Sequence, residues 1–255
     1  MKKIPLLRQL IRRNPEITEK ELYARILCGE TYVAGEKIRD PERLIPFDAA
    51  ITFGQKKFVS RGGVKLDYAL REWEIDVSGK VFVDAGCSTG GFTQALLLRG
   101  ASHVHAVDVG YNQLDYSLRT RPDVSVHERT NILKLTSFSP SPDAAVVDVS
   151  FRPVVPVIQH LFPLLKDKWI IALIKPQFEL KNPDENFNGI IRKKEIHADI
   201  LRTVVHSLWD AEIYPVSIVE SPIPGRKGNR EFLFKIAGSA AVTLEGLNKI
   251  VSELL

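Results

Sequence analysis

The feature that most limits how this chain can fold is a series of apolar runs that begins near residue 80. The runs are Val81–Asp84, Val104–Asp108, Val124–His127, Ala144–Asp148 and Trp169–Ile174. Each is nearly continuous, as in parallel strands that helices cover on both faces. A helix is predicted between the first two runs, over Gly90–Leu98. This alternation predicts a doubly wound α/β domain.

Two later runs, Ile213–Val219 and Phe232–Ile236, alternate between apolar and polar residues instead. Their close spacing predicts an antiparallel hairpin at one edge of the sheet. A helix is predicted ahead of the first strand, over Val64–Trp73. The glycines of Phe58–Gly63 allow unusual backbone angles, so this stretch is predicted to join the α/β domain to the part before it.

The first 57 residues have the pattern of a small α+β domain. Helices are predicted over Pro5–Arg13 and Glu19–Cys28, the second with a capping box of Thr18 and Glu21. A hairpin over Tyr32–Ile38 and a strand over Ile51–Phe53 follow. A unit of this size can bind a partner but is too small to hold much of a catalytic site. The predicted boundaries are 1–57 for this unit, 58–63 for the linker and 64–255 for the α/β domain.

Charge separates the two parts of the chain. The first 60 residues hold 12 lysines and arginines against 8 aspartates and glutamates, and the whole chain holds 35 against 31, which leaves 23 of each for the remainder. A basic appendage on a neutral body favours a polyanionic partner, most often nucleic acid. An ordinary solvated surface explains the same balance.

Membrane, secreted and metal-binding classes fit the sequence poorly. The longest unbroken apolar run, Trp169–Ile174, is too short to cross a bilayer as a helix. The N-terminus has no apolar core of a signal peptide. Cys28 and Cys87 make no disulfide framework, and neither the cysteines nor the six histidines have metal-ligand spacing. These features predict a cytoplasmic protein without a metal.

The stretch from Asp84 to Phe92 is a glycine-rich turn between a strand and a helix. Ser88 stands where a dinucleotide-binding turn needs its second glycine, and no lysine follows as in a P-loop. A carboxylate such as Asp108, at the end of the second strand, can accept hydrogen bonds from both hydroxyls of a ribose. Asp84, at the end of the first strand, can bind a cationic ammonium group. This combination favours S-adenosylmethionine, which carries no phosphate. A tight turn with capping carboxylates is the simpler alternative.

Seven ordered motifs lie between residues 55 and 237. They are V-S-R-G-G-V-K-L (59–66), D-A-G-C-S-T-G-G-F-T (84–93), A-V-D-V-G-Y-N-Q-L (106–114), E-R-T-N (128–131), D-V-S-F (148–151), I-K-P-Q-F-E (174–179) and G-N-R-E (228–231). The motifs resemble those of the TlyA/hemolysin A family, which is similar to the FtsJ-type ribose 2′-O-methyltransferases and carries an N-terminal S4-like RNA-binding domain. The resemblance implies a Rossmann-like class I S-adenosylmethionine methyltransferase domain with seven strands, the last antiparallel. It also implies methylation of ribosomal RNA.

The resemblance implies a catalytic set of Lys65, Asp148, Lys175 and Glu231. Asp148 and Lys175 fall at the ends of predicted strands, where doubly wound sheets carry their sites. A lysine that takes the proton of a ribose hydroxyl needs a pKa near the operating pH, and a neighbouring cation favours this. Lys65 is expected to be that cation, and the two carboxylates to orient the lysines and the 2′-oxygen.

Two further sets of residues and a partner are expected. The cofactor-binding residues are Asp84, Gly86, Ser88, Thr89, Gly90, Gly91, Asp108 and Asn131. The residues expected to contact RNA are Arg12, Arg13, Lys20, Arg25, Arg61, Arg226 and Lys227, because basic side chains reach phosphates whatever the base sequence. The expected partners are ribosomal RNA or ribosomal subunits, with no stable membrane association.

Other functions leave different marks on a sequence. Amino-group methylation of a base usually shows an Asn/Asp-Pro-Pro-aromatic stretch where this chain has D-V-S-F, and cytosine C5 chemistry needs a nucleophilic cysteine, whereas Cys87 lies in the cofactor turn. A non-catalytic RNA-binding or ribosome-assembly factor is the main alternative. A membrane-active hemolysin is the other.

Overall fold

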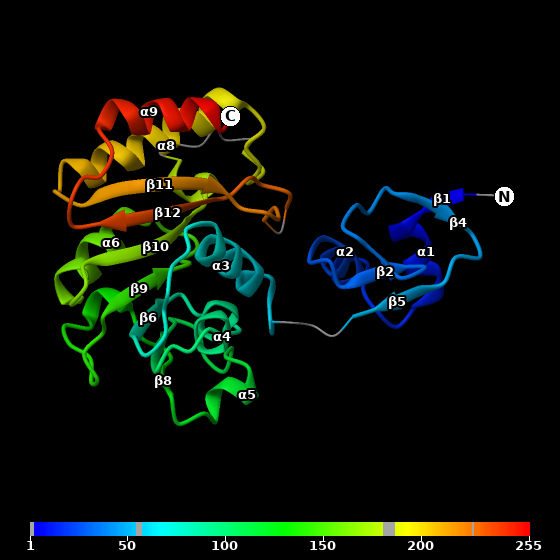
Figure 1. The fold of residues 1–255 in the computed structure, drawn as a ribbon, viewed down its shortest axis with the longest axis horizontal. Coiled ribbons are helices and arrows are strands. Elements are labelled where there is room, and N and C mark those ends of the chain that lie inside the picture. The colour runs from blue at the N-terminus through cyan, green and yellow to red at the C-terminus, as the bar shows by residue number, and fades with distance from the viewer. Residues whose placement is uncertain (1–2, 55–57, 181–186, 226) are drawn as a thin grey trace. The chain divides into compact units, whose positions relative to one another are not determined.

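The computed structural model describes residues 3–54, 58–180, 187–225 and 227–255. Arg226, which is expected to contact RNA, therefore lies outside the described residues. The chain divides into two compact units, Met1–Arg61 and Gly62–Leu255, and the division falls within the stretch predicted as a linker (Figure 1). No helix of the described residues is both long and apolar enough to cross a membrane.

Unit 1 packs two helices against two small antiparallel sheets. The helices bury leucines and isoleucines between them, including Leu6, Leu10, Leu22 and Ile26. The Thr18 hydroxyl accepts a hydrogen bond from the Glu21 amide at 3.3 Å, which caps the second helix as predicted. Strands β1 and β4 were not predicted, because each has three residues and ends in proline. The elements are β1 (Lys3–Pro5), α1 (Leu6–Arg13), α2 (Glu19–Leu27), β2 (Thr31–Val33), β3 (Glu36–Ile38), β4 (Leu44–Pro46) and β5 (Ile51–Phe53), in sheets of order β1-β4 and β3-β2-β5.

Unit 2 is built on one seven-stranded sheet of order β11-β12-β10-β9-β6-β7-β8. Strands β6 to β10 are parallel, and β12 runs antiparallel to both β10 and β11. The predicted doubly wound sheet with an antiparallel last strand is confirmed. The strands are β6 (Val81–Ala85), β7 (His103–Val107), β8 (Val124–His127), β9 (Ala144–Val147), β10 (Trp169–Ile174), β11 (Tyr214–Glu220) and β12 (Phe232–Ala237).

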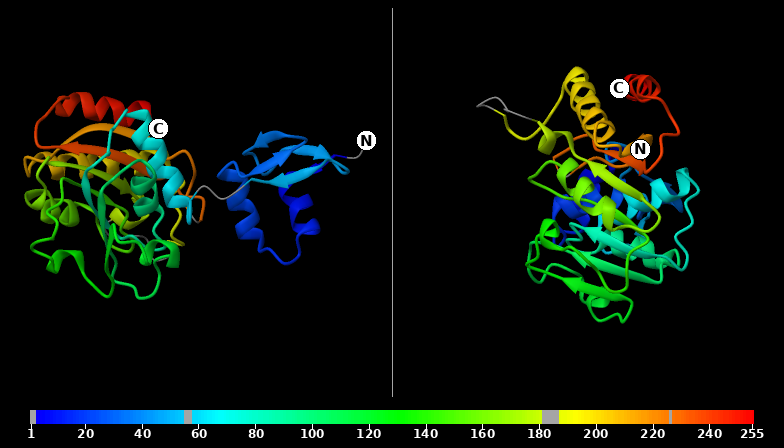
Figure 2. Two further views of the ribbon diagram at one scale, coloured as in Figure 1. Left: turned by 60° about the horizontal axis from the view of Figure 1, so that its bottom comes forward. Right: turned by 90° about the vertical axis from the view of Figure 1, so that its left-hand side faces the viewer.

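Helices cover both faces of this sheet (Figure 2). One face carries α6, α8 and α9, whose apolar side chains share a buried core with alternate residues of the strands, such as Val83, Ile174 and Phe232. The other face carries α3 and α4 (Figure 1). The helices of unit 2 are α3 (Arg61–Glu72), α4 (Gly91–Leu98), α5 (Tyr116–Arg119), α6 (Val155–Leu161), α7 (Pro176–Glu179), α8 (Lys194–Trp209) and α9 (Leu244–Glu253), with 3₁₀ turns η1 (Ile132–Lys134) and η2 (Phe162–Leu164).

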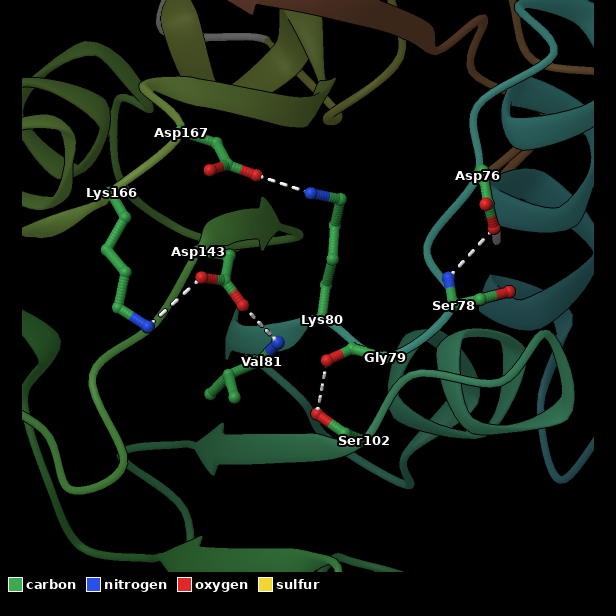
Figure 3. A network of polar contacts seen from close by, with 9 residues as sticks. All are labelled: Asp76, Ser78, Gly79, Lys80, Val81, Ser102, Asp143, Lys166 and Asp167. Carbon is green, nitrogen blue, oxygen red and sulfur yellow. Dashed lines mark hydrogen bonds and ion pairs between the residues drawn. The ribbon is translucent and has the colours of Figure 1, made fainter.

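Polar contacts at the amino ends of the parallel strands are structural (Figure 3). Lys80 pairs with Asp167 at 2.6 Å. Asp143 accepts a hydrogen bond from the Val81 amide at 2.7 Å and pairs with Lys166 at 3.1 Å. These contacts tie together the loops that lead into β6, β9 and β10. The charged groups at this edge are thus paired with one another in contacts between loops.

The strand order changes direction between β6 and β9. The chain passes from β6 outward through β7 and β8, and then returns to the other side of β6 as β9. The connections that follow β6 and β9 therefore lead in opposite directions from adjacent strands at the carboxyl edge of the sheet, and ligands of doubly wound proteins bind at this position.

Candidate active site

The register of the central strands brings the predicted catalytic residues to one edge of the sheet. Ile174, the last residue of β10, pairs with Phe232, the first residue of the antiparallel β12. Lys175 and Glu231, the next residues outward, therefore emerge side by side. Asp148 directly follows β9, which is the other neighbour of β10.

The four residues form two ion pairs. Lys175 Nζ lies 2.6 Å from Asp148 Oδ1, with side chains 12% and 23% exposed. Lys65, on α3, pairs with Glu231, and these side chains are only 7% and 5% exposed. The first pair is thus open enough to meet a substrate, whereas the second is almost fully buried.

The alternation of a strand explains why these residues leave the sheet on the face of α3 and α4. Ile174 and Phe232 point into the core under α6, α8 and α9. Because successive side chains of a strand alternate between faces, Lys175 and Glu231 turn to the opposite face. The contact between Glu231 and Lys65 of α3 agrees with this orientation.

The glycine-rich turn after β6 fits closely against the turn after β9. Gly86 has φ +87°, and a Cβ there would lie 2.6 Å from the backbone oxygen of Asp148. Only glycine therefore lets the two turns approach so closely. Gly90, with φ +93°, begins α4 directly before Gly91. Ser88 also has a positive φ, of +49°, and Thr89 lies between it and Gly90.

Asp84 is fully buried at the end of β6 and is only half satisfied. Its Oδ2 accepts hydrogen bonds from the amide and hydroxyl of Thr93, at 2.9 and 2.6 Å. Its Oδ1 is buried without a partner in the described structure. Burial raises the pKa of Asp84 to about 7, against the lowering effect of the Thr93 hydrogen bonds. A buried carboxylate oxygen without a donor is suited to a cationic ligand.

Asp108 and Asn131 approach the same edge from the strands beyond β6. Asp108 accepts hydrogen bonds from the amides of Ser88 at 2.9 Å and Gly110 at 2.7 Å, so it ties the end of β7 to the glycine-rich turn. The Asn131 side-chain oxygen accepts from the Leu133 amide at 3.1 Å and from Arg152 at 3.3 Å. Its oxygen is therefore used within the protein.

Cys87 does not have the properties of a nucleophile. The thiol is buried in the turn, and burial raises its pKa. This agrees with the expectation that the chain does not use cysteine chemistry on cytosine.

Three contacts that the sequence did not predict join the segment after β9 to the segment after β10. Lys175 Nζ donates to the Ser150 hydroxyl at 2.8 Å. The rings of Phe151 and Phe178 lie 4.9 Å apart, and the Val154 amide donates to Glu179 at 2.9 Å. The Phe151 ring is 89% exposed, and an exposed aromatic ring is a surface on which unpaired bases stack.

The basic residues predicted to bind RNA in unit 1 differ in their surroundings. Arg13 donates to the backbone oxygens of Phe47 and, at 2.8 Å, Ala49, so its guanidinium group holds a turn of the unit. Arg25 pairs with Glu21 at 2.8 Å and stacks over the ring of Phe53. These two groups therefore have structural contacts.

Arg12 and Lys20 are exposed. Arg12 lies over the ring of Phe47 and lines a groove with Lys3 and Arg8. This groove combines three cations with the apolar side chains of Ile4 and Ile11.

The remaining predicted RNA contacts lie in unit 2 or at its boundary. Arg61, half-buried, is the first residue of α3. Lys227 is exposed, and its Nζ donates to the backbone oxygen of Asn188 at 3.2 Å. The buried Asn229 fastens the same two segments, because its amide group donates to Gly189 at 2.7 Å and its oxygen accepts from Ile191 at 3.0 Å.

The chain was compared with known proteins. Residues 58–237 match the model of the FtsJ-like methyltransferase family. The chain is 34% identical over 251 residues to the 16S/23S rRNA (cytidine-2′-O)-methyltransferase TlyA of Mycobacterium tuberculosis, which covers 95% of this chain and 94% of that one. It is 38% identical over 213 residues to hemolysin A of Brachyspira hyodysenteriae, covering 82% and 89%.

A solved structure from Streptococcus thermophilus, provisionally described as a hemolysin, covers 100% of this chain. The match covers 96% of that chain, with 30% sequence identity and a TM-score of 0.74.

Proposed function

The chain belongs to the FtsJ-like methyltransferase family, and on this premise we propose that it transfers the methyl group of S-adenosylmethionine to a ribose 2′-oxygen in ribosomal RNA. The observation that carries the proposal is the pair of Lys175 and Asp148 at the carboxyl edge of the sheet, beside the glycine-rich turn. The four residues expected for ribose 2′-O-methylation thus come together from four separate elements.

The residues at this turn fit S-adenosylmethionine. The unpartnered Oδ1 of Asp84 suits the ammonium group of the amino-acid part. Asp108 is placed to accept hydrogen bonds from ribose hydroxyls. Gly86, Ser88, Thr89, Gly90 and Gly91 keep the backbone free of bulky side chains. Asn131, in the loop after β8 and directly before η1, has an amide group to donate.

In the proposed reaction Lys175 is the general base. S-adenosylmethionine supplies the methyl group on a sulfonium, which leaves as a neutral thioether. A ribose hydroxyl is a weak nucleophile until its proton is removed, so Lys175 accepts that proton at Nζ. Asp148 fixes Nζ at 2.6 Å and balances the charge that the lysine gains.

The buried pair of Lys65 and Glu231 supports this geometry. Glu231 precedes β12 beside Lys175, and its pairing with Lys65 anchors the start of β12 to α3. We assign the pair the task of orienting the 2′-oxygen and Lys175. Removing either partner of a buried ion pair leaves the other charge buried without compensation, which destabilises the fold.

Unit 1 is proposed to be an S4-like RNA-binding module. Arg12 and Lys20 are exposed, and the groove beside Arg12 carries further cations. Basic groups of this kind bind phosphates without reading the bases. Arg13 and Arg25 contribute to this surface mainly by holding its fold. A ribosomal RNA substrate is consistent with a cytoplasmic protein, and neither cysteine takes part in a disulfide among the described residues, in keeping with that compartment.

The test is transfer of tritiated methyl groups to isolated ribosomal subunits and to naked ribosomal RNA, followed by digestion to nucleosides. Wild type is compared with Lys175→Ala and with Lys166→Ala, a lysine at the opposite edge of the sheet. We expect wild type and Lys166→Ala to put label into a 2′-O-methylated nucleoside. This nucleoside is cytidine if the chain acts as its TlyA relatives do.

We expect Lys175→Ala to fold and bind RNA but to transfer no methyl group. Turnover by Lys175→Ala would refute the assignment of the base. If wild type labelled no substrate and did not bind S-adenosylmethionine in calorimetry, the non-catalytic RNA-binding function would replace the enzyme.

A further inference from the structure

The nitrogen of Lys175 has two partners, Asp148 in an ion pair and Ser150 in a hydrogen bond. Its Nζ lies 2.6 Å from Asp148 Oδ1 and donates to the Ser150 hydroxyl at 2.8 Å. Asp148 and Ser150 both follow β9, two residues apart. One short segment therefore provides an ion-pair partner and a hydrogen-bond acceptor for one catalytic nitrogen.

A lysine base works best when its lone pair is held in one direction. A neutral amine has two N–H bonds and one lone pair, and a tetrahedral nitrogen holds them in fixed relative directions. When one N–H bond is donated to Ser150, the second N–H bond and the lone pair share the two remaining directions, and the Asp148 carboxylate attracts the N–H bond to its side and leaves the other direction to the lone pair. Without the bond to Ser150 the amine can rotate about its Cε–Nζ bond, and the lone pair is no longer held in one direction.

We propose that Ser150 is a positioning residue of the methyl transfer, which with Asp148 directs the lone pair of Lys175 to the ribose 2′-hydroxyl. This inference rests on the proposed function. The proton of the 2′-hydroxyl passes to the Lys175 lone pair, the 2′-oxygen forms the new bond to the methyl carbon, and the electrons of the broken carbon–sulfur bond stay on sulfur. The lysine, now charged, has three N–H bonds and keeps both partners.

The segment that carries Ser150 is held in register with the segment that carries Lys175. Ser150 contacts Lys175, the ring of Phe151 packs on that of Phe178, and the Val154 amide donates to Glu179. Phe151 adopts a φ of +61°, in the left-handed region that an L-residue occupies at a cost. The three contacts join segment 150–154 to segment 175–179.

The expected effect of removing the Ser150 hydroxyl falls on the rate of chemistry and leaves binding unchanged. Ser150→Ala frees one N–H of Lys175 and lets its nitrogen rotate. The free energy of a hydrogen bond to an ionisable group corresponds to roughly a ten- to hundred-fold change in rate. Ser150 is exposed, so the change to alanine leaves no buried cavity. The affinities for RNA and S-adenosylmethionine should therefore stay at the wild-type values.

The experiment is single-turnover methylation of ribosomal RNA or subunits over a range of RNA concentrations. It compares wild type with Ser150→Ala, with Ser150→Thr, which restores a hydroxyl, and with Ser137→Ala, an exposed serine on the loop before β9. We expect Ser150→Ala to lower the maximal rate roughly ten- to hundred-fold without changing the half-saturating RNA concentration. Ser150→Thr should recover most of that rate, and Ser137→Ala should match wild type.

A wild-type maximal rate for Ser150→Ala would overturn the inference while leaving the proposed function intact. So would equal losses in the alanine and threonine variants, if calorimetry shows that both bind S-adenosylmethionine normally. A wild-type enzyme that methylates neither substrate would instead refute the proposed function itself.

Discussion

The buried pair of Lys65 and Glu231 makes a prediction about stability that is separate from catalysis. Its side chains are 7% and 5% exposed, so water screens neither charge. Removing one partner leaves an uncompensated buried charge, which costs about 3–5 kcal/mol. Replacing both with apolar residues of similar size removes the desolvation penalty together with the attraction, and is often neutral.

We therefore expect Lys65→Met and Glu231→Leu each to destabilise unit 2 by about 3–5 kcal/mol, and the double variant to lose much less than either. For a domain of this size the single changes correspond to a fall in Tm of roughly 6–20 °C. Urea unfolding followed by tryptophan fluorescence measures this, because Trp73, Trp169 and Trp209 all lie in unit 2.

The matched control is the exposed pair of Lys80 and Asp167, whose side chains are each 36% exposed (Figure 3). Lys80→Met should cost about 1 kcal/mol or less, because exposed ion pairs contribute little. The reasoning is refuted if Lys65→Met costs no more than Lys80→Met. It is also refuted if the losses of Lys65→Met and Glu231→Leu simply add in the double variant. The stable double variant should transfer no methyl groups.

Three further predictions concern the cofactor turn and RNA binding. Burial raises the pKa of Asp84 from 3.8 to about 7, so the carboxyl group is protonated below that pH. Calorimetry should therefore show that the affinity for S-adenosylmethionine falls by up to about tenfold for each pH unit below 7. Asp84→Asn should remove this dependence, and a flat wild-type profile would contradict the assigned role. Gly86→Ala should lower the free energy of unfolding by more than about 2 kcal/mol, measured by heat or urea, because the added Cβ meets the Asp148 carbonyl. Gly79→Ala, with φ +70° and no atom within 4 Å of the added Cβ, should lower it by about 1 kcal/mol. Equal losses would show that the close approach at Gly86 is unimportant. Replacing Arg12 and Lys20 together by glutamine should weaken RNA binding and reduce the slope of log affinity against log salt by about 2, and an unchanged slope would exclude both from phosphate contact.

The backbone of unit 2 was largely predictable because its strands are fully buried. A parallel strand with helices on both faces must be apolar throughout, so β6, β9 and β10 are visible as continuous runs. Helix α8 was not predicted, although its buried residues, such as Ala198, Leu201 and Val205, have the three- and four-residue spacing of an amphipathic helix.

The candidate site was predictable in its residues but not in its contacts. The order of the motifs indicates Lys65, Asp148, Lys175 and Glu231, but no local pattern shows which lysine pairs with which carboxylate. That pairing is set by the antiparallel register of β12 on β10. In the same way, Arg13 has the sequence context of an exposed cation, and only the folded turn at Phe47 and Ala49 supplies the carbonyls that engage it.

The antiparallel direction of β12 has a consequence for how the enzyme is made. Glu231 lies ahead of its strand, and its partner Lys65 is 166 positions earlier in the chain. A nascent chain exposes the glycine-rich turn, Asp148 and Lys175 well before β12 has been synthesised, and contacts between such distant residues form after local ones, because closing the long loop costs entropy. The first five strands of the sheet thus emerge as an incomplete enzyme. A chain that ends before Glu231 and β12 lacks one of the four residues proposed for catalysis, and is therefore not expected to methylate RNA.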